Sequence, residues 1–299
     1  MIQLYLNLVF FFALGLLFGS FINMAIYRTR AKKAFTGRSF CDFCKKPLIY
    51  KDLIPLFSFI YYKRRSRCCK KKLDKTMPIV ELVTALVFSI IYYLLSNIQI
   101  SYISFAGVLL PFQLIYLLYA LSISIILIFV FFYDIKYFEI PFKPIFIGYV
   151  LWIIFTVFKI LAYKQNLITN ISEGSLGKYL LQTNIVNDRT GFFITENILY
   201  AFYFAFFVFI FFIFLFLITK GRGMGFGDVY TAPLLALIAG FPAGVIFLFS
   251  AFLVGAFYGV ITIILKINTV KSRVPFGPFL IIGLITSLLF GNFIVKFYM

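Results

Sequence analysis

The sequence has no histidine in 299 residues. This absence excludes Ser-His and Cys-His nucleophilic catalysis, imidazole general bases and histidine metal ligands. Acidic residues are also scarce, with ten Asp and Glu against 28 Lys and Arg. Only a few side chains can therefore transfer protons near neutral pH, and the acidic residues can be considered one by one.

Long parts of the chain have no charged residue at all. Hydrophobic residues make up 63% of the sequence, more than the roughly one half of a soluble domain. Because a helix needs roughly 20 apolar residues to cross a bilayer, we predict an all-α, polytopic membrane helix bundle with about eight transmembrane helices. The charge-free runs are 1–27, 82–133, 197–219, 229–265 and 274–295, with a shorter one at 144–158.

The basic residues are concentrated in one loop. The net charge is +18, and 16 of the 28 Lys and Arg lie between Arg28 and Lys75. Basic residues in a short loop between apolar segments mark the cytoplasmic side and contact anionic lipid. We therefore predict membrane lipid, and no nucleic acid, as the partner of this charge. The predicted divisions are 1–27 as the first transmembrane helix, 28–77 as a small cysteine-containing basic cytoplasmic subdomain, and 78–299 as the transmembrane core.

The alternation of runs and loops predicts the topology. With the basic loop inside, the polar stretch 162–197 is expected outside as a solvated loop. Residues 229–265 need an even number of crossings, either as two short helices broken near Gly240, Pro242 and Gly244 or as a re-entrant hairpin. The other expected spans are about 4–27, 78–96, 112–133, 144–161, 198–219 and 276–295.

Two acidic residues differ from the other eight. Asp134 and Asp228 each lie at the predicted cytoplasmic end of a membrane segment, at comparable depth. Two carboxylates in contact cannot both ionise, so one can act as general base toward water and the other as general acid toward an amide. Such a pair hydrolyses a peptide bond without histidine. Alternatively, each acid is a helix cap or an ion-pair partner of Lys136 or Arg222.

The surroundings of Asp228 are rich in glycine. Gly225 and Gly227 alternate with larger residues in GMGFGD (223–228). Glycine permits close backbone approach and positive φ, so we expect these two residues to lie beside an extended substrate. Glu81 lies about one turn into the second span, where an unpaired acid is costly. We expect it to have a basic structural partner.

Several motifs resemble the bacterial prepilin peptidases. GMGFGD resembles the G-x-G-D signature of intramembrane aspartic peptidases, and DIKYFEIP (134–141) is similar to the segment of the first catalytic aspartate in prepilin peptidases. The resemblance is collinear over essentially the whole chain. The further similar segments are LGLLFGSFINMAIYR (14–28), GRSFCDFCKKPL (37–48), DLIPLFSFI (52–60), PIVELVTAL (78–86) and VPFGPFLIIG (274–283).

The resemblance implies a bifunctional enzyme of the bacterial inner membrane. It implies that Asp134 and Asp228 are the catalytic pair, and that leader peptides of type IV prepilins or pseudopilins are cut at the cytoplasmic face. It also implies that the new amino terminus is N-methylated with S-adenosylmethionine. The chain departs from the family pattern at Phe142, where an acid is frequent, and at Tyr230, where the family has lysine.

The third departure concerns the cysteines. Cys41 and Cys44 form a C-x-x-C pair, which in a reducing compartment favours zinc over a disulfide. The family's second pair aligns on Ser66 and Cys69, and Cys68 is available in place of Ser66. We predict a structural zinc site of Cys41, Cys44, Cys68 and Cys69, with three cysteines plus another ligand, or no metal, as alternatives.

Two other functions remain open at this point. A peptidase without methyltransferase activity is consistent with the irregular cysteines. An ion-coupled membrane transporter is the alternative of another class, because intramembrane acids can carry ions. A transporter predicts acids deep within the spans, whereas this sequence has its two notable acids at one interface.

Overall fold

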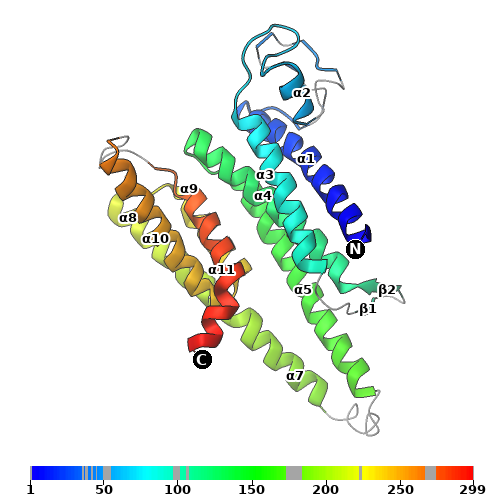
Figure 1. Cartoon of the computed structure of the whole chain (residues 1–299). Coiled ribbons are helices and arrows are strands. Elements are labelled where there is room, and N and C mark those ends of the chain that lie inside the picture. The colour runs from blue at the N-terminus through cyan, green and yellow to red at the C-terminus, as the bar shows by residue number, and fades with distance from the viewer. Residues whose placement is uncertain are drawn as a thin grey trace. The chain divides into compact units, whose positions relative to one another are not determined.

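The computed structural model describes residues 2–35, 37, 40–41, 43–44, 46–49, 55–96, 102–105, 108–172, 184–221, 224–266 and 274–298. Most of these residues are helical, which confirms the predicted helix bundle (Figure 1). The helices are α1 (Ile2–Arg30), α2 (Phe57–Tyr61), α3 (Thr76–Ser96), α4 (Phe112–Tyr137), α5 (Phe142–Ser172), α7 (Ile185–Ile194), the π-helical η2 (Thr195–Leu199), α8 (Tyr200–Thr219), α9 (Phe226–Ala239), α10 (Ala243–Ile264) and α11 (Gly277–Tyr298).

The membrane helices follow the charge-free runs of the sequence. Within the described residues, six helical segments are long and apolar enough to cross a membrane, and two more, Phe226–Ala239 and Gly277–Gly291, are apolar but shorter. α9 has 14 residues, which gives a length of about 21 Å at 1.5 Å per residue. This is less than the roughly 30 Å of a bilayer's hydrocarbon core. Between α9 and α10 the chain breaks at Gly240 and Pro242, as predicted.

Two details differ from what the sequence led us to expect. The predicted all-α class is confirmed, but β1 (Tyr102–Phe105) and β2 (Val108–Pro111) add a short antiparallel hairpin with Tyr102 opposite Pro111. This hairpin lies inside a charge-free run, so charge alone could not separate it from the adjoining spans. The stretch 162–197 is also not simply a loop, because α5 continues to Ser172 and α7 and η2 cover Ile185–Leu199.

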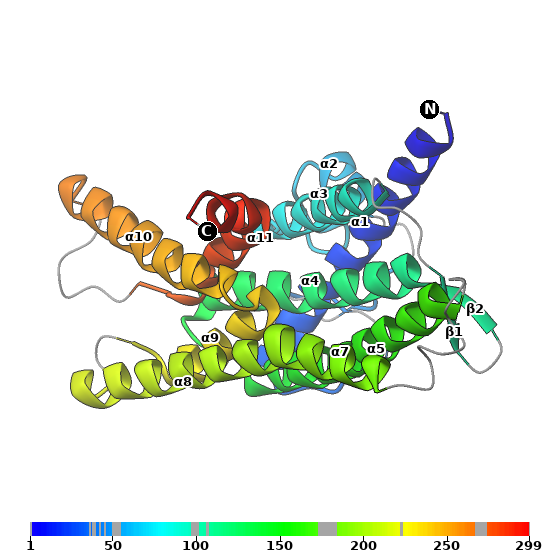
Figure 2. The ribbon, with the colours of Figure 1, turned by 90° about the horizontal axis from the view of Figure 1, so that it is seen from below.

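The chain divides into two compact units, Met1–Ile100 with Gln113–Phe132, and Ser101–Phe112 with Tyr133–Met299. In the first unit, α1 and α3 lie side by side in both views (Figures 1 and 2). Gly15 and Gly19 make this approach possible, because a Cβ on either would lie 2.5 Å from the Cα of Ala85 or Glu81. Real Cβ atoms do not approach backbone so closely, so both positions require glycine.

α9 lies at the core of the second unit. It contacts α5, α8, α10 and α11, and most of its residues are buried, as expected for a helix that is apolar on all sides. Two side chains of α5 hold it by hydrogen bonds to its carbonyls. Tyr149 Oη donates to Tyr230 O at 3.0 Å, and Trp152 Nε1 donates to Leu237 O at 3.1 Å. The buried helix therefore provides a rigid support for Asp228 in its first turn.

Candidate active site and candidate metal centre

Asp134 lies in the last turn of α4, where the chain leaves the helix. Phe138 has a φ of 56°, and its N–H donates to Asp134 O at 2.8 Å, so the helix ends one turn after the acid. The Asp134 side chain is 4% exposed. Its Oδ2 accepts a hydrogen bond of 3.0 Å from the N–H of Gly277, the first residue of α11. The carboxyl group therefore caps the amino terminus of another helix in the same unit.

Asp228 lies in the first turn of α9, directly after the glycine-rich segment. Gly225 is the N-cap residue, and the Asp228 N–H donates to Gly225 O at 3.2 Å. The Asp228 side chain does not cap its own helix and is only 4% exposed. Its Oδ1 is buried and has no hydrogen-bond partner among the residues that the structure describes. An unpaired buried atom of this kind costs roughly 1–3 kcal/mol, so it calls for a specific explanation, of which a catalytic role is one.

The two carboxyl groups are close enough to interact electrostatically. Both are buried and both belong to the second unit. Burial and mutual repulsion disfavour the charged form of both groups, so the pair is suited to hold one proton. The arrangement can therefore supply an acid and a base at one place, which is what hydrolysis of an amide requires.

The alternative structural roles of the two acids are only partly realised. Asp134 does cap a helix, as one alternative allowed, but the helix is α11 and not its own. The cap uses Oδ2, so it leaves the second oxygen available for chemistry. Arg222 lies outside the described residues, so its pairing with Asp228 stays an open alternative.

Ile140 fills the space between two glycines beside the acids, a role that the sequence did not indicate. A Cβ on Gly227 would lie 2.8 Å from Ile140 Cβ. A Cβ on Gly277 would lie 2.7 Å from Asp134 Oδ2 and 3.1 Å from Ile140 Cδ1. At Gly225 a Cβ would make only an ordinary contact, 3.6 Å from Asp228 Oδ2. Gly227 is therefore required for packing, while the substrate contact expected of Gly225 and Gly227 stays a prediction.

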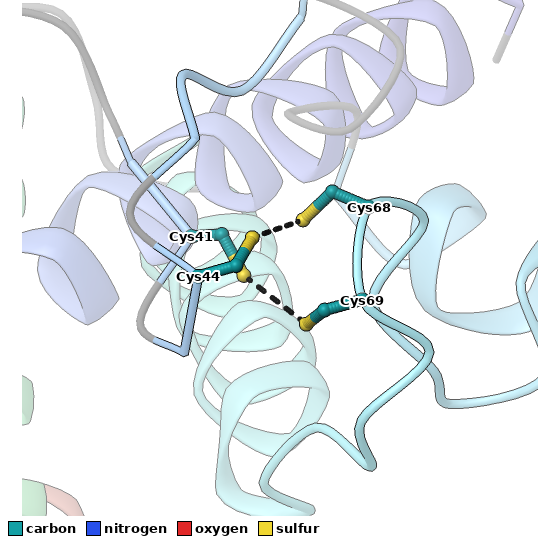
Figure 3. Close-up of side chains that lie close together, drawn as sticks. All are labelled: Cys41, Cys44, Cys68 and Cys69. Atoms are coloured by element: carbon teal, nitrogen blue, oxygen red, sulfur yellow. Dashed lines mark hydrogen bonds between the residues drawn. The ribbon is translucent and has the colours of Figure 1, made fainter.

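The four cysteines come together in the first unit (Figure 3). Cys41 and Cys44 project from one loop and Cys68 and Cys69 from another, with all four Sγ atoms within 4.8 Å of one another. Tetrahedral zinc with bonds of about 2.3 Å separates its sulfur ligands by about 3.8 Å. Cys41 Sγ lies 3.8 Å from Cys69 Sγ, and Cys44 Sγ lies 3.0 Å from Cys68 Sγ. The donor set therefore fits a thiolate-bound metal such as zinc.

The two cysteine loops have the same construction. Phe40 pairs with Pro47 and Arg65 with Lys72 in single antiparallel bridges, so a shift of 25 residues superposes one turn on the other. The Cys41 N–H donates to Lys46 O at 2.9 Å, and the Ser66 N–H donates to Lys71 O at 2.8 Å. Ser66 therefore occupies the position of Cys41, Cys69 occupies that of Cys44, and Cys68 is the additional cysteine.

Ser66 remains within the cluster although it is not a thiol. Its Oγ lies 3.3 Å from Cys41 Sγ and 3.1 Å from Cys68 Sγ. Burial acts to raise the pKa of Cys41, but hydrogen bonds from the backbone of Cys44 and Phe43 and from Ser66 prevail and lower it to about 6. The hydrogen bond with Cys44 raises the pKa of Cys68 to about 11. One thiolate is thus already favoured in this cluster before a metal binds.

Among the described residues, the partner of Glu81 is a backbone N–H and not the basic side chain that we expected. Within the described residues, its Oε2 accepts a hydrogen bond of 2.8 Å from the N–H of Leu56. Leu56 has a φ of 55° and directly precedes α2. The acid therefore ties the basic loop to α3 through the backbone, and a backbone donor leaves no mark in the sequence.

Comparison with known proteins gives one match to the first part of the chain and others to nearly the whole chain. Residues 13–95 match a family model described as the bacterial peptidase A24 N-terminal domain. A prepilin leader peptidase/N-methyltransferase of Aeromonas salmonicida is 27% identical over 326 aligned positions, which cover 99% of this chain and 94% of the relative. The chain is thus similar over nearly its whole length to bacterial proteins named prepilin leader peptidase/N-methyltransferase.

Further relatives match the chain over shorter stretches and at higher identity. A prepilin leader peptidase/N-methyltransferase of Klebsiella pneumoniae is 36% identical over 94 residues, 29% of this chain and 41% of the relative. A type 4 prepilin-like proteins leader peptide-processing enzyme of Escherichia coli is 38% identical over 93 residues, which cover 35% of that enzyme. No solved structure matches the chain. The relatives are enzymes and give no support to an ion-coupled transporter.

Proposed function

We propose that this protein is a membrane aspartic endopeptidase that removes the leader peptide of type IV prepilins or pseudopilins. The observation that carries the proposal is the buried pair of Asp134 and Asp228. Asp134 Oδ2 accepts a hydrogen bond from Gly277, and Asp228 Oδ1 has no partner among the described residues. The full-length relatives named prepilin leader peptidase/N-methyltransferase support the same reaction.

The proposed mechanism uses one proton shared between the two carboxyl groups. The ionised carboxylate takes a proton from water as the water oxygen bonds to the scissile carbonyl carbon. The protonated partner then gives its proton to the amide nitrogen as the carbon–nitrogen bond breaks. Burial of both side chains keeps bulk water from screening the pair. The second turnover begins when the carboxyl groups again share one proton.

We place the reaction at the cytoplasmic face of the bacterial inner membrane. The support is the basic loop, because Lys and Arg in short loops favour the cytoplasmic side. Asp134 at the end of α4 and Asp228 at the start of α9 then lie at that face. A leader that carries positive charge would reach the pair from the cytoplasm, and the apolar segment after the cleavage site would stay among the helices.

The second proposed activity is N-methylation of the new amino terminus with S-adenosylmethionine. Its support is the printed name of the full-length relatives. We propose that zinc is held by Cys41, Cys44, Cys68 and Cys69, whose sulfurs lie within 4.8 Å of one another. When bound, zinc would cross-link the two cysteine loops and stabilise the fold of the basic segment. A peptidase that lacks methylation is the remaining alternative.

The test compares the wild-type protein with Asp134→Asn and Asp228→Asn. Membranes with each protein are incubated with a prepilin, and mass spectrometry follows leader removal and the mass of the new amino terminus. We expect both variants to lose cleavage by a factor of about 10⁴ or more, because neither can share the proton. Full cleavage by either variant would refute the carboxyl-pair mechanism. A methyl group that appears only with S-adenosylmethionine would establish the second activity.

A further inference from the structure

Tyr230 connects the two segments that carry the aspartates. It lies two residues after Asp228 in α9, and its Oη donates a hydrogen bond to Ile140 O. Ile140 belongs to the short connection between α4, which ends shortly after Asp134, and α5. All of these residues are in the second unit. One hydroxyl group therefore joins the connection after the first acid to the helix of the second.

Ile140 is held at its side chain as well as at its carbonyl. A Cβ added to Gly227 would lie 2.8 Å from Ile140 Cβ. A Cβ added to Gly277 would lie 3.1 Å from Ile140 Cδ1. Gly227 adjoins Asp228 in sequence, and Gly277 donates to Asp134 Oδ2. The residue that accepts the Tyr230 hydrogen bond thus packs against the immediate neighbours of both carboxyl groups.

Tyr230 is itself fixed in place. Tyr149 Oη donates to its backbone carbonyl at 3.0 Å. Its ring lies edge-on to Phe142 and Phe226, with centroid separations of 5.4 and 6.0 Å. Such aromatic pairs contribute roughly 0.5–1.5 kcal/mol each beyond area burial. A side chain held by its backbone and by two rings is a suitable support for a hydrogen bond that sets a distance.

The packing of the ring does not explain the hydroxyl group, because phenylalanine would make the same ring contacts. The hydroxyl lies near enough to both aspartates for electrostatic interaction. Its single proton is engaged with Ile140 O, so it does not donate to a carboxylate. An effect of the hydroxyl group on the acids would therefore pass through Ile140 and not through a direct hydrogen bond.

We propose that Tyr230 is a positioning residue, and that its hydrogen bond to Ile140 sets the separation of Asp134 and Asp228. The inference rests on the proposed peptidase activity. If one carboxyl group is displaced, the chemical step slows. The affinity for the substrate is retained, because the substrate is bound mainly by other parts of the enzyme. The effect of the hydroxyl should therefore fall on kcat and not on KM.

The test uses Tyr230→Phe with Tyr258→Phe as the matched control. Both changes remove one oxygen from a tyrosine of the second unit, and the Tyr258 ring packs against Phe279. The purified, detergent-solubilised proteins are compared for prepilin cleavage and for hydrogen exchange in the segment 138–145. For Tyr230→Phe we expect kcat to fall at least about tenfold with KM unchanged, and exchange in 138–145 to rise. The Tyr258→Phe protein should match wild type in both measurements.

The outcomes separate this inference from the proposed function. If both aspartate variants abolish cleavage and Tyr230→Phe keeps the wild-type kcat, the positioning role is wrong and the peptidase proposal stands. A rise in KM alone would also overturn it, because that would assign Tyr230 to substrate binding. If the aspartate variants still cleave, the carboxyl-pair proposal fails. The hydrogen-exchange measurement does not depend on cleavage. Unchanged exchange in 138–145 would show that Tyr230 does not hold the connection between α4 and α5.

Discussion

Position 66 shows how one residue changes a ligand set. Ser66 lies in its turn where Cys41 lies in the other, with the same backbone hydrogen bond to the fifth following residue. A hydroxyl group is a poor zinc ligand beside thiolates. Cys68 lies 3.0 Å from Cys44, and so provides the fourth sulfur from a different place in the turn. We therefore interpret Cys68 as a replacement for a ligand lost at position 66.

Moving the cysteine back tests this interpretation. We expect Cys68→Ser to weaken zinc binding at least about tenfold, and the double variant Ser66→Cys, Cys68→Ser to restore it. Zinc per protein chain is measured by elemental mass spectrometry after dialysis against a weak chelator. Ser66→Ala serves as the control, because it keeps all four thiols. Full zinc occupancy in Cys68→Ser would instead support a site of three cysteines and another ligand.

The sequence was sufficient to identify these cysteines but not their roles. The C-x-x-C spacing and the adjacent pair predicted the four residues that the structure brings together. It could not predict that Ser66 contacts two of the sulfurs, or that Glu81 accepts from the backbone of Leu56. Both facts depend on where backbone N–H and hydroxyl groups point after folding, and no residue pattern records this.

At the scale of the elements, the connection between α4 and α5 and the start of α9 form one structure. Two of the positions where the chain departs from the pattern of the prepilin peptidases, Phe142 and Tyr230, contact each other edge to face. Phe142 begins α5 and Tyr230 lies in the second turn of α9. An aromatic contact here joins the helices without charge, which is favourable in an apolar environment.

The close approach of these elements depends on Gly227. We expect Gly227→Ala to reduce cleavage at least about tenfold, because an overpacked methyl group costs roughly 1–3 kcal/mol and moves Ile140 or Asp228. Gly259→Ala in α10 is the matched control, since a Cβ there meets nothing within 4 Å. Cleavage rates and melting temperatures of both variants provide the measurement. Wild-type activity in Gly227→Ala would show that the connection yields without disturbing the acids.

The elements themselves could be predicted unequally well. Charge-free runs gave the membrane helices, because a bilayer excludes charge and requires a minimum length. They could not reveal the β1–β2 hairpin, which is as uncharged as the helices around it. They also understated α5, whose polar end from Lys164 to Ser172 is helical although it has the composition of a loop. Polarity limits burial but does not prevent helix formation.

At the scale of the whole molecule, the two candidate centres lie in different compact units. The cysteine cluster is in the first unit, and Asp134 and Asp228 are in the second. The matched family domain, residues 13–95, also falls within the first unit. The family-model match therefore concerns the cysteine-containing part, while the full-length alignment at 27% identity also covers the positions of the acids. A substitution in one unit can therefore disturb the site of that unit and leave the other site intact.

This separation predicts that the two activities can be removed one at a time. We expect Cys44→Ser to lose zinc and to reduce N-methylation at least about tenfold, while leader cleavage stays within about twofold of wild type, because Asp134 and Asp228 belong to the other compact unit. Conversely, Asp228→Asn should fail to cleave a prepilin but should methylate a pilin supplied without its leader. Mass spectrometry of the pilin amino terminus measures both reactions in one sample.

If Cys44→Ser abolished cleavage while the protein stayed in the membrane at wild-type level, the metal-bound loop would have to support the carboxyl pair. The peptidase would then depend on both units.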